Sequence, residues 1–361
     1  MDWKNDRLSR RLSFSPERTE TIFAQLAEID AIKKAFRLTN RLLPQTISRL
    51  TQSVIVTSTG ASNRIEGNRL SDEEVETLYR TMRIRKLRTR DEQEVAGYLE
   101  MLELILSSHA GMPLTESLVL QLHRDMLRYS EKDERQRGAY KFGPNRVEAK
   151  DASGNVVGVI FDPTPPHLTP KEMRDLVAWQ NWADAEGFKH PLIRIANFVF
   201  EYLAIHPFQD GNGRTSRLLT NLLLLQQGYD FTALVSHEKL IEARKADYYL
   251  ALRQTQSSWK SEQEDITPWL TYFLEILAAQ ANAALALITN ERIENELSPK
   301  QLALWEWAQS RNESEFSRRD AVAALNLPER TVGQIIRKLL DLKRLERLGH
   351  SRATRYRIRR D

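Results

Sequence analysis

The chain has 361 residues, which exceeds the size at which one hydrophobic core usually stops growing, so we expect roughly two or three domains. The composition, 41% hydrophobic and 28% charged with 7 Trp, 10 Tyr and 12 Phe, excludes a mostly disordered chain. Without cysteine there are no disulfides, thiol nucleophiles or thiolate metal sites. No uncharged apolar run reaches the ~18 residues of a membrane helix, and the N-terminus lacks a secretory h-region, so we expect a cytoplasmic protein with no membrane partner.

The net charge of +4 is unevenly distributed along the chain. Residues 298–361 contain 15 Lys and Arg against 8 Asp and Glu, whereas the rest of the chain contains 38 against 41. A basic C-terminal segment on a near-neutral body indicates an anionic partner, and a solvated basic surface is the equally weighted alternative.

The first ~110 residues have helical periodicity. A helix is predicted over 46–65, ending before Gly67, and a second is predicted to start at Ser71 as N-cap with Glu74 three residues on. The basic arm 81–90 that follows is interpreted as a solvated helix face, with nucleic-acid binding as the alternative.

A helical core interrupted by one hairpin is predicted over about 115–285, with Thr115 as its first cap. Ser153-Gly154-Asn155 lies between two β-prone runs and predicts the hairpin turn. Helices are predicted again from Pro170, over 192–205, from the TSRLL segment onward, and over 238–255 and 267–293.

The C-terminal segment predicts three short helices followed by a basic strand at HSRATRYRIRR. This is the order of a winged helix-turn-helix, with the turn at Asn326-Leu327-Pro328 and the second helix of the motif at 329–342. Small three-helix modules also dock proteins, so both partners stay open. The fold class is therefore mainly α, with regions at 1–112, 113–290 and 298–361.

The segment from His206 to Arg217, HPFQDGNGRTSR, has the properties of an anion site. Pro207 disfavours helical geometry at His206, so a helix must end there and another begin near Gly213. Glycines at a helix N-terminus leave outward-pointing N–H groups and the positive end of the helix dipole, which suit phosphate. Arg214 and Arg217 share one face of the new helix, and guanidinium groups match phosphate oxygens.

Two more groups give this loop a chemical capability. Asp210 places a carboxylate where a nucleotide-bound Mg²⁺ would need one, and His206 can take a proton near neutral pH. Each residue alone has an ordinary explanation: a loop histidine, a turn, a helix cap or a solvated face. The segment lacks the GxxxxGK[ST] of a Walker A loop, and His206 has no second ligand at zinc spacing.

HPFQDGNGRTSR resembles, position for position, the signature HPFx[DE]GNGRxxR of the Fic family of nucleotide transferases, and the resemblance extends over roughly 45–285. It implies a Fic-type helical core with a hairpin flap, and transfer of AMP from ATP to a Ser, Thr or Tyr hydroxyl of a protein, with release of pyrophosphate. ATP and an unidentified target protein are the implied partners, Mg²⁺ is the implied cofactor, and self-modification and a homodimer are further expectations.

The resemblance also implies roles for the loop residues. His206 would be the general base, and Asp210 would hold Mg²⁺ on the α- and β-phosphates. Phe208 would anchor the loop in the core. The anion cradle would be Gly211, Asn212 and Gly213, with Asn212 donating to the α-phosphate; Arg214 would hold the β-phosphate, Arg217 the γ-phosphate, and Thr215 and Ser216 would belong to the same nucleotide site.

Outside the loop, the resemblance assigns a flap and a base site. The flap residues Gly158, Val159, Ile160 and Phe161 would pair as a β-edge with the target segment. Tyr248, Tyr249 and Gln256 would contact the base and ribose.

Ser62-Asn63-Arg64-Ile65-Glu66-Gly67 resembles the family's inhibitory motif [ST]xxxE[GN]. This implies an N-terminal inhibitory helix in which Glu66 pairs with Arg217 and diverts ATP into an unproductive pose, the motif residues being Ser62, Glu66 and Gly67. An ordinary exposed Glu at a helix end is the alternative. Two other functions stay open: a DNA-binding regulator acting through the C-terminal segment, and removal of AMP with Glu66 orienting a water.

Overall fold

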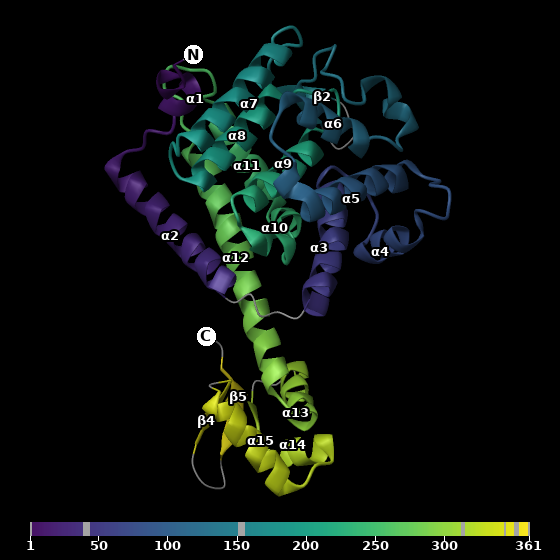
Figure 1. The fold of residues 1–361 in the computed structure, drawn as a ribbon, viewed down its shortest axis with the longest axis vertical. Helices are drawn as coiled ribbons and strands as arrows, with labels where there is room; N and C mark the ends of the chain where they lie inside the picture. The colour runs from purple at the N-terminus through teal and green to yellow at the C-terminus, as the bar shows by residue number, and fades with distance from the viewer. Residues whose placement is uncertain are drawn as a thin grey trace. The chain divides into compact units, whose positions relative to one another are not determined.

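Helices form most of the chain in the computed structural model, which describes residues 2–38, 44–150, 156–311, 315–342, 344–349 and 354–359. The chain divides into two compact units, Met1–Leu285 and Ala286–Asp361. The expected fold class, mainly α with small β elements, is confirmed (Figure 1). The finer division of the first unit into 1–112 and 113–290 stays a prediction.

The first unit begins with helices that precede the hairpin. These are α1 (Arg7–Arg10), α2 (Pro16–Leu38), α3 (Pro44–Ile65), α4 (Asp72–Thr81), α5 (Arg90–Ser108) and α6 (Glu116–Met126), with short 3₁₀ turns at Trp3–Asn5, His109–Gly111 and Glu131–Gln136.

The hairpin and a second set of helices complete the first unit. They are β1 (Val147–Lys150), β2 (Val156–Phe161), α7 (Thr169–Ala185), α8 (Pro191–Ile205), α9 (Asn212–Gln226), α10 (His237–Ala243), α11 (Lys245–Gln256) and the first part of α12 (Thr267–Glu296), which continues into the second unit, with a 3₁₀ turn at Asp230–Ala233. The two strands pair antiparallel, and the predicted turn at Ser153-Gly154-Asn155 lies outside the described residues.

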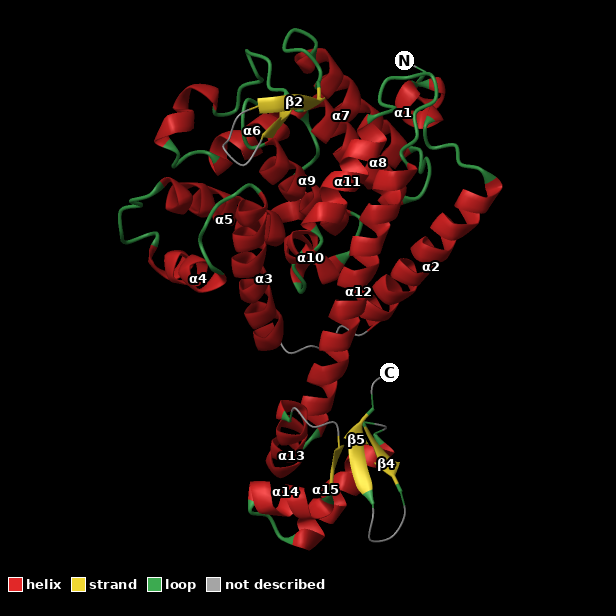
Figure 2. Cartoon of the chain, turned by 180° about the vertical axis from the view of Figure 1, so that it is seen from behind, coloured by secondary structure: helices red, strands yellow, loops and turns green. Residues whose placement is uncertain are grey.

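Helix α8 is the centre of the first core. Every residue from Leu192 to Ile205 is buried, including its own Phe198 and Phe200. Helices α7 and α9 pack against it (Figure 2). Most of its residues are apolar, as expected of a buried helix, and its buried polar residues have partners: Arg194 pairs with Asp184, and Asn197 and Glu201 pair with Arg11. Its last turn therefore holds His206 on a rigid support.

Local signals placed several boundaries correctly. The predicted capping box is present, with Ser71 accepting from the Glu74 N–H, and Thr115 caps α6. Gly67 has a φ of +97° just after α3, as a glycine stop requires.

Two local expectations were wrong. Residues 82–89 are not helical, since Thr89 caps a new helix and Arg85 reaches the Glu92 carboxylate in the first turn of that helix. The helix expected over 238–255 is two helices, broken at Arg244, whose φ of −119° and ψ of 36° are not helical.

Helix α12 contains the one segment among the described residues that has the length and composition of a membrane span. By length and composition alone, Thr267–Thr289 is apolar enough to cross a membrane, and half of that stretch is buried inside the protein. Glu275 interrupts it, so it is not an uncharged apolar run of the length considered in the sequence. Core helices of globular proteins have the same composition, so the segment is weak evidence for a membrane span.

The second unit has its own core. Helices α13 (Pro299–Ser310), α14 (Arg318–Leu325) and α15 (Glu329–Asp341) surround a sheet of order β3-β5-β4, formed by Glu315–Phe316, Arg355–Ile358 and Leu345–Leu348. Buried Leu304, Trp305, Ile336 and Tyr356 join these elements. Asn326, with a φ of +50°, ends α14 at the predicted turn. The helices and strand expected here are present, and the assignment as a winged helix-turn-helix stays a prediction.

Candidate active site

The loop between α8 and α9 presents His206 in a defined form. His206 caps α8 in the left-handed region, with a φ of +53°, and its N–H donates to Tyr202 O at 2.9 Å. Its Nδ1 lies 3.3 Å from Leu203 O, and because a carbonyl only accepts, Nδ1 carries the proton and Nε2 keeps its lone pair. Burial, and then the nearby Lys141 ammonium, lower the pKa of His206 to about 4. At neutral pH this imidazole is a neutral proton acceptor.

Phe208 anchors the same loop in the core. Its ring is fully buried and stacks on His123 at a centroid distance of 3.7 Å. The Asn212 side chain binds the Phe208 backbone twice, accepting from its N–H at 2.8 Å and donating to its carbonyl at 2.7 Å. One N–H of the Asn212 amide remains for any further acceptor, such as the α-phosphate expected above.

The N-terminus of α9 has the geometry of an anion site. Gly211 is the N-cap with a φ of +81°, and no side chain caps the helix. The first turn therefore leaves the N–H groups of Asn212, Gly213 and Arg214 without intrahelical acceptors. At Gly213 an added Cβ would lie only 2.1 Å from Glu66 Oε1, so the Glu66 carboxylate sits directly against this turn.

Arg217 is buried behind that carboxylate. Its Nε donates to Ser62 Oγ at 2.8 Å, and its Nη2 donates to Ser62 O at 2.9 Å and to Glu66 Oε1 at 2.8 Å. The side chain is 3% exposed, against 35% for Glu66. Burial opposes the charge of Arg217, but the Glu66 carboxylate raises the pKa of Arg217 above its usual value. Nη1 is buried with no hydrogen-bond partner in the described structure.

Arg214 belongs to a ring of alternating charges. It lies 3.3 Å from Asp210 and 3.4 Å from Glu94, and Arg90 closes the ring by contacting Glu94 at 2.6 Å and Asp210 at 3.4 Å. Burial would raise the pKa of Asp210, but Arg214, the Gly211 N–H and Arg90 together lower it. Asp210 is thus ionised at neutral pH.

One carboxylate cluster among the described residues has the spacing of a metal site. Oxygens of Glu94, Asp133 and Asp210 lie within 4.8 Å of one another. Carboxylate oxygens suit Mg²⁺, and Asp210 is the member that faces solvent. The Asp210 carboxylate therefore fits the expected cation. Glu94 and Asp133 are buried and already have partners: Glu94 pairs with Arg90 and Arg214, and Asp133 accepts from Ser130 and Gln136.

The comparisons with known proteins agree with this geometry. Residues 113–224 match the family described as Fic/DOC. The chain contains a Fic/DOC domain. It is 29% identical over 212 residues, 58% of this chain, to a protein adenylyltransferase, fic-1, of Caenorhabditis briggsae, and 26% identical over 231 residues, 63% of this chain, to a protein adenylyltransferase Fic of Nematostella vectensis. It spans 37% and 48% of the lengths of these relatives.

Solved structures extend the likeness beyond the matched segment. A Fic family protein from Desulfovibrio desulfuricans is 26% identical, with 97% of this chain and 98% of that chain covered and a TM-score of 0.61. A Fic domain containing signalling protein from Bacteroides thetaiotaomicron is 25% identical, with 75% and 97% covered and a TM-score of 0.58.

The Fic/DOC domain brings most of the predicted site residues together. His206, Asp210, Gly211, Gly213 and Arg214 share the one loop and helix start, and Glu66 and Ser62 reach it from α3. The side chains of Thr215 and Ser216 turn inward, and the Ser216 hydroxyl donates to Gly213 O at 2.7 Å, so a nucleotide contact would fall to their backbone.

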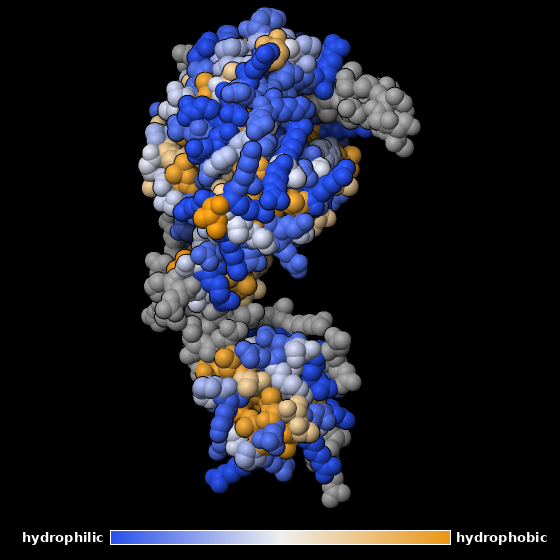
Figure 3. Space-filling view, turned by 90° about the vertical axis from the view of Figure 1, so that its right-hand side faces the viewer, coloured by the Kyte–Doolittle hydropathy of each residue, from blue (hydrophilic) through white to orange (hydrophobic). Residues whose placement is uncertain are grey.

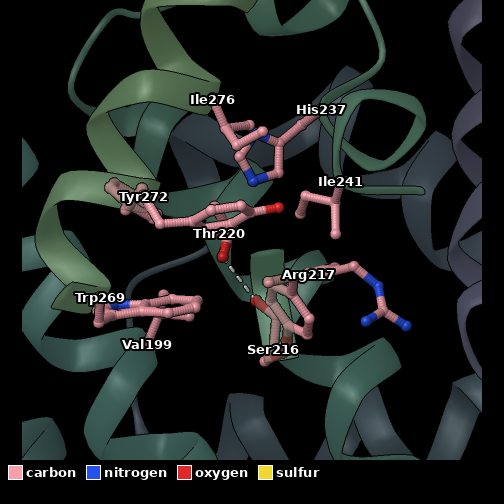
Figure 4. A pocket seen from close by; sticks show the side chains of 11 residues that line it. Val199, Ser216, Arg217, Thr220, His237, Ile241, Trp269, Tyr272 and Ile276 are labelled. Carbon is pink, nitrogen blue, oxygen red and sulfur yellow. Dashed lines mark hydrogen bonds between the residues drawn. The ribbon is translucent and has the colours of Figure 1, made fainter. Parts of the chain in front are cut away.

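The expected base site lies on α11. Tyr248 is buried and packs edge-on against Tyr249 at 5.2 Å, while Tyr249 is 45% exposed and Gln256 ends the helix half-buried. Tyr248 and Arg217 line a small cavity of about 10 Å³, into which Tyr272 and His237 point (Figure 4). It has room for a single water molecule and not for a larger ligand.

The flap is only partly described. β2 contains Gly158, Val159, Ile160 and Phe161 and pairs with β1, and within the described residues its other edge has no strand partner. The Phe161 ring is buried against Trp259 at 5.3 Å. Side chains of the other three flap residues lie outside the description.

Sequence reasoning missed several residues of the site. His123 accepts from Gly138 N at its Nδ1 and donates from Nε2 to Asp210 O, both at 3.0 Å. Its position on the apolar face of α6, between Val119 and Met126, was an available signal of a buried histidine. Arg90, Glu94, Lys141 and Asn145 gave no signal of belonging to the site, because their contacts with the α8–α9 loop and with Arg214 are far away in sequence.

Proposed function

We propose that this protein transfers AMP from ATP to a hydroxyl side chain of a protein, itself included. The observation that carries the proposal is a neutral imidazole, His206, beside a helix N-terminus that has two buried arginines in its first two turns. This supplies a base and an anion cradle within one short loop. The relatives named as protein adenylyltransferases support the same reaction.

The proposed reaction is an in-line displacement at the α-phosphorus. The target hydroxyl oxygen bonds to the α-phosphorus as the bond to the bridging oxygen of the β-phosphate breaks, and pyrophosphate leaves. The hydroxyl proton goes to Nε2 of His206. Arg214 binds the β-phosphate, Arg217 the γ-phosphate, and the free N–H groups at the start of α9 bind the α-phosphate.

Asp210 is the residue that would hold Mg²⁺. The cation would neutralise phosphate charge and orient the leaving group. Arg90 and Arg214 neutralise the Asp210 carboxylate in this structure, and a bound cation would take over part of that neutralisation. The flap edge of β2 would align the target segment by strand addition.

Glu66 would act as an inhibitor in this scheme. Its carboxylate lies against Gly213 and pairs with Arg217, so it occupies the space and the cation that we assign to the triphosphate. The relevant part of α3 would then be an inhibitory helix, with Ser62 orienting Arg217 and Gly67 ending the helix.

Intact-mass analysis of Glu66→Gly with ATP and Mg²⁺ tests the proposal. We expect a gain of one or more AMP units, and no gain in Glu66→Gly/His206→Ala. Glu242→Gly is a matched control, because Glu242 pairs with Arg64 on α3 without touching Arg217. Absence of AMP from the Glu66→Gly protein and from added candidate hydroxyl peptides would reject the function.

AMP removal is a second reaction for the same site. Glu66 is partly exposed beside the α9 N-terminus, where its carboxylate can orient a water toward a bound AMP-protein ester. Incubating an adenylylated protein with the wild type and with Glu66→Gln decides between the two directions. Release of AMP only by the wild type would favour removal.

DNA binding by the second unit is a separate candidate. Helix α15 buries Val332, Ile335 and Leu339 and exposes Arg337 and Lys338 on the opposite side. In the face of the molecule that Figure 3 shows, the surface is mostly hydrophilic and is interrupted by apolar side chains. DNA binding by the full chain should weaken with a steep salt dependence, and Arg337→Ala/Lys338→Ala should reduce the slope by about 2. A slope near zero would favour a protein partner.

A further inference from the structure

We propose that Lys141 and Asn145 are positioning residues that fix the backbone from which His206 reaches the target hydroxyl. Both lie in the irregular segment between α6 and β1, far from the loop in sequence. The proposal deepens the proposed function, because it assigns a support to the base on which that function rests.

Asn145 binds the loop on both sides of Pro207. Its Nδ2 donates to His206 O at 2.9 Å and to Phe208 O at 2.6 Å, so both N–H groups of the amide are used. Its Oδ1 accepts from Lys141 Nζ at 2.8 Å, which fixes which end of the amide faces the loop.

Lys141 binds the two remaining carbonyls of the turn. Its Nζ donates to Ile205 O at 2.9 Å, and its own N–H donates to Pro207 O at 2.9 Å. The residue is 4% exposed, so these bonds are shielded from water. Together the two residues satisfy the four successive carbonyls from Ile205 to Phe208.

These hydrogen bonds matter because the turn contains an unfavourable backbone conformation. His206 has a φ of +53°, which non-glycine residues adopt rarely and keep only when the surroundings determine it. The direction of the imidazole follows from that backbone conformation. A displacement of about 1 Å from the reacting position can cost about 10²-fold in rate.

The Lys141 ammonium also affects the pKa of the His206 imidazole through its charge. Burial and Lys141 lower the pKa of His206, whereas Glu66 from α3 and Asp210 from the loop oppose the shift. Burial also lowers the pKa of Lys141 itself to about 8, so it is mostly charged at neutral pH. Removal of the Lys141 charge should therefore raise the pKa of His206 toward its ordinary value, a change that a purely structural lysine would not produce.

Nitrogen-15 NMR of the histidine side chains tests this without any nucleotide. The chain has seven histidines, and His206→Gln identifies the signal of His206. In Lys141→Met the pKa of His206 should rise, and in Lys141→Arg it should stay near the wild-type value. In Asn145→Ala the single Nδ1–H form should give way to a mixture of tautomers.

Kinetics provide the second measurement. In a Glu66→Gly background, Asn145→Ala and Lys141→Met should lower kcat for AMP transfer by about 10²-fold while KM for ATP stays within about twofold. Asn145→Ser, which keeps one donor, should be intermediate and serves if Asn145→Ala does not fold. Asn181→Ala and Lys171→Met are matched controls, because Asn181 binds the Leu114 carbonyl and Lys171 pairs with Asp175, both outside the site.

The two measurements separate the proposals. If the Glu66→Gly parent transfers no AMP, the proposed function fails, yet the NMR result still decides whether Lys141 and Asn145 position His206. If the folded variants leave both the tautomer and the pKa of His206 at wild-type values, the positioning role is overturned. Equal losses of kcat in the controls would overturn it as well.

Discussion

Glu66 and Gly213 are in direct contact: an added Cβ on Gly213 would meet Glu66 Oε1 at 2.1 Å. The same oxygen accepts from Arg217 at 2.8 Å. One carboxylate oxygen thus lies at the N-terminus of α9 and on the buried guanidinium at once. Negative charge is favoured at this end of a helix, which explains why an anionic side chain is stable there and why a phosphate would compete with it.

Glu66→Gln should increase the affinity for ATP. The variant keeps the size of the side chain and removes the charge that pairs with Arg217. Because Glu66 is about one-third exposed, we take the low end of the usual coupling range, about 1 kcal/mol, or roughly a fivefold lower Kd. Isothermal titration calorimetry with Mg²⁺-ATP measures it.

The control for this prediction is Glu242→Gln, which removes a carboxylate from Arg64 instead of Arg217. It should leave the Kd for ATP unchanged. An unchanged Kd in Glu66→Gln as well would mean that the carboxylate does not compete with nucleotide.

Arg217→Lys should weaken ATP use without unfolding the protein. Lysine keeps the charge but cannot reproduce the fork that binds Ser62 Oγ, Ser62 O and Glu66 together. Loss of one charge-assisted hydrogen bond to phosphate, about 1.5–3 kcal/mol, corresponds to a rise in KM for ATP of roughly tenfold or more in a Glu66→Gly background.

Steady-state kinetics and a thermal melt together check the Arg217 prediction. Arg64→Lys is the matched substitution on the neighbouring helix, since Arg64 binds Asp72 and Glu242 outside the site. A normal KM in Arg217→Lys would remove Arg217 from the γ-phosphate role.

Gly211→Ala should destabilise the loop directly. Gly211 has a φ of +81°, and an added Cβ would lie 2.9 Å from Met126 Cε and 3.4 Å from the His123 ring. Positive φ and overpacking each cost about 1–3 kcal/mol. We expect the free energy of unfolding, measured by urea denaturation, to fall by this order, with a lower urea midpoint. Gly111→Ala should be nearly neutral, because nothing lies within 4 Å of its added Cβ. Equal midpoints would show that the loop adapts freely.

Local sequence signals predicted the position of the loop but not its surroundings. Pro207, Gly211 and the capping residues act on neighbouring positions, so the helix ends could be placed to within one or two residues. Helix α9 begins at Asn212, where the sequence indicated Gly213 or Arg214.

The ring of charges around Arg214, and the hydrogen bonds from Lys141 and Asn145 to the loop carbonyls, were not predictable in the same way. Arg90 reaches Asp210 across 120 positions, and Asn145 reaches His206 across 61. Nothing in the spacing near Arg90 or Asn145 differs from an ordinary solvated loop or helix start. Such contacts depend on how α5 and the segment before β1 pack on the loop, which a local pattern does not encode.

Arg11→Ala should destabilise the first unit strongly at neutral pH. Glu201 on α8 is almost fully buried, and Arg11 contacts it at 2.6 Å while Arg7 binds from a more exposed position. Removing one partner of a buried pair usually costs about 3–5 kcal/mol, and the remaining Arg7 contact places our expectation at the lower end. Arg18→Ala, which breaks an exposed pair with Asp265, should cost less than about 1 kcal/mol.

The pH dependence of this loss identifies its cause. Burial opposes ionisation of Glu201, but Arg11 and Arg7 lower its pKa from 4.5 to about 2. The stabilisation that this lowered pKa represents is present above about pH 4.5 and disappears as the pH falls through about 2, because the unfolded chain then binds the proton that the folded protein resists. Urea unfolding at pH 7 and pH 3 should therefore show a smaller difference between wild type and Arg11→Ala at pH 3. A difference that is the same at both pH values would assign the loss to packing of the Arg11 side chain on Phe200, which it covers at 5.2 Å, and not to its charge.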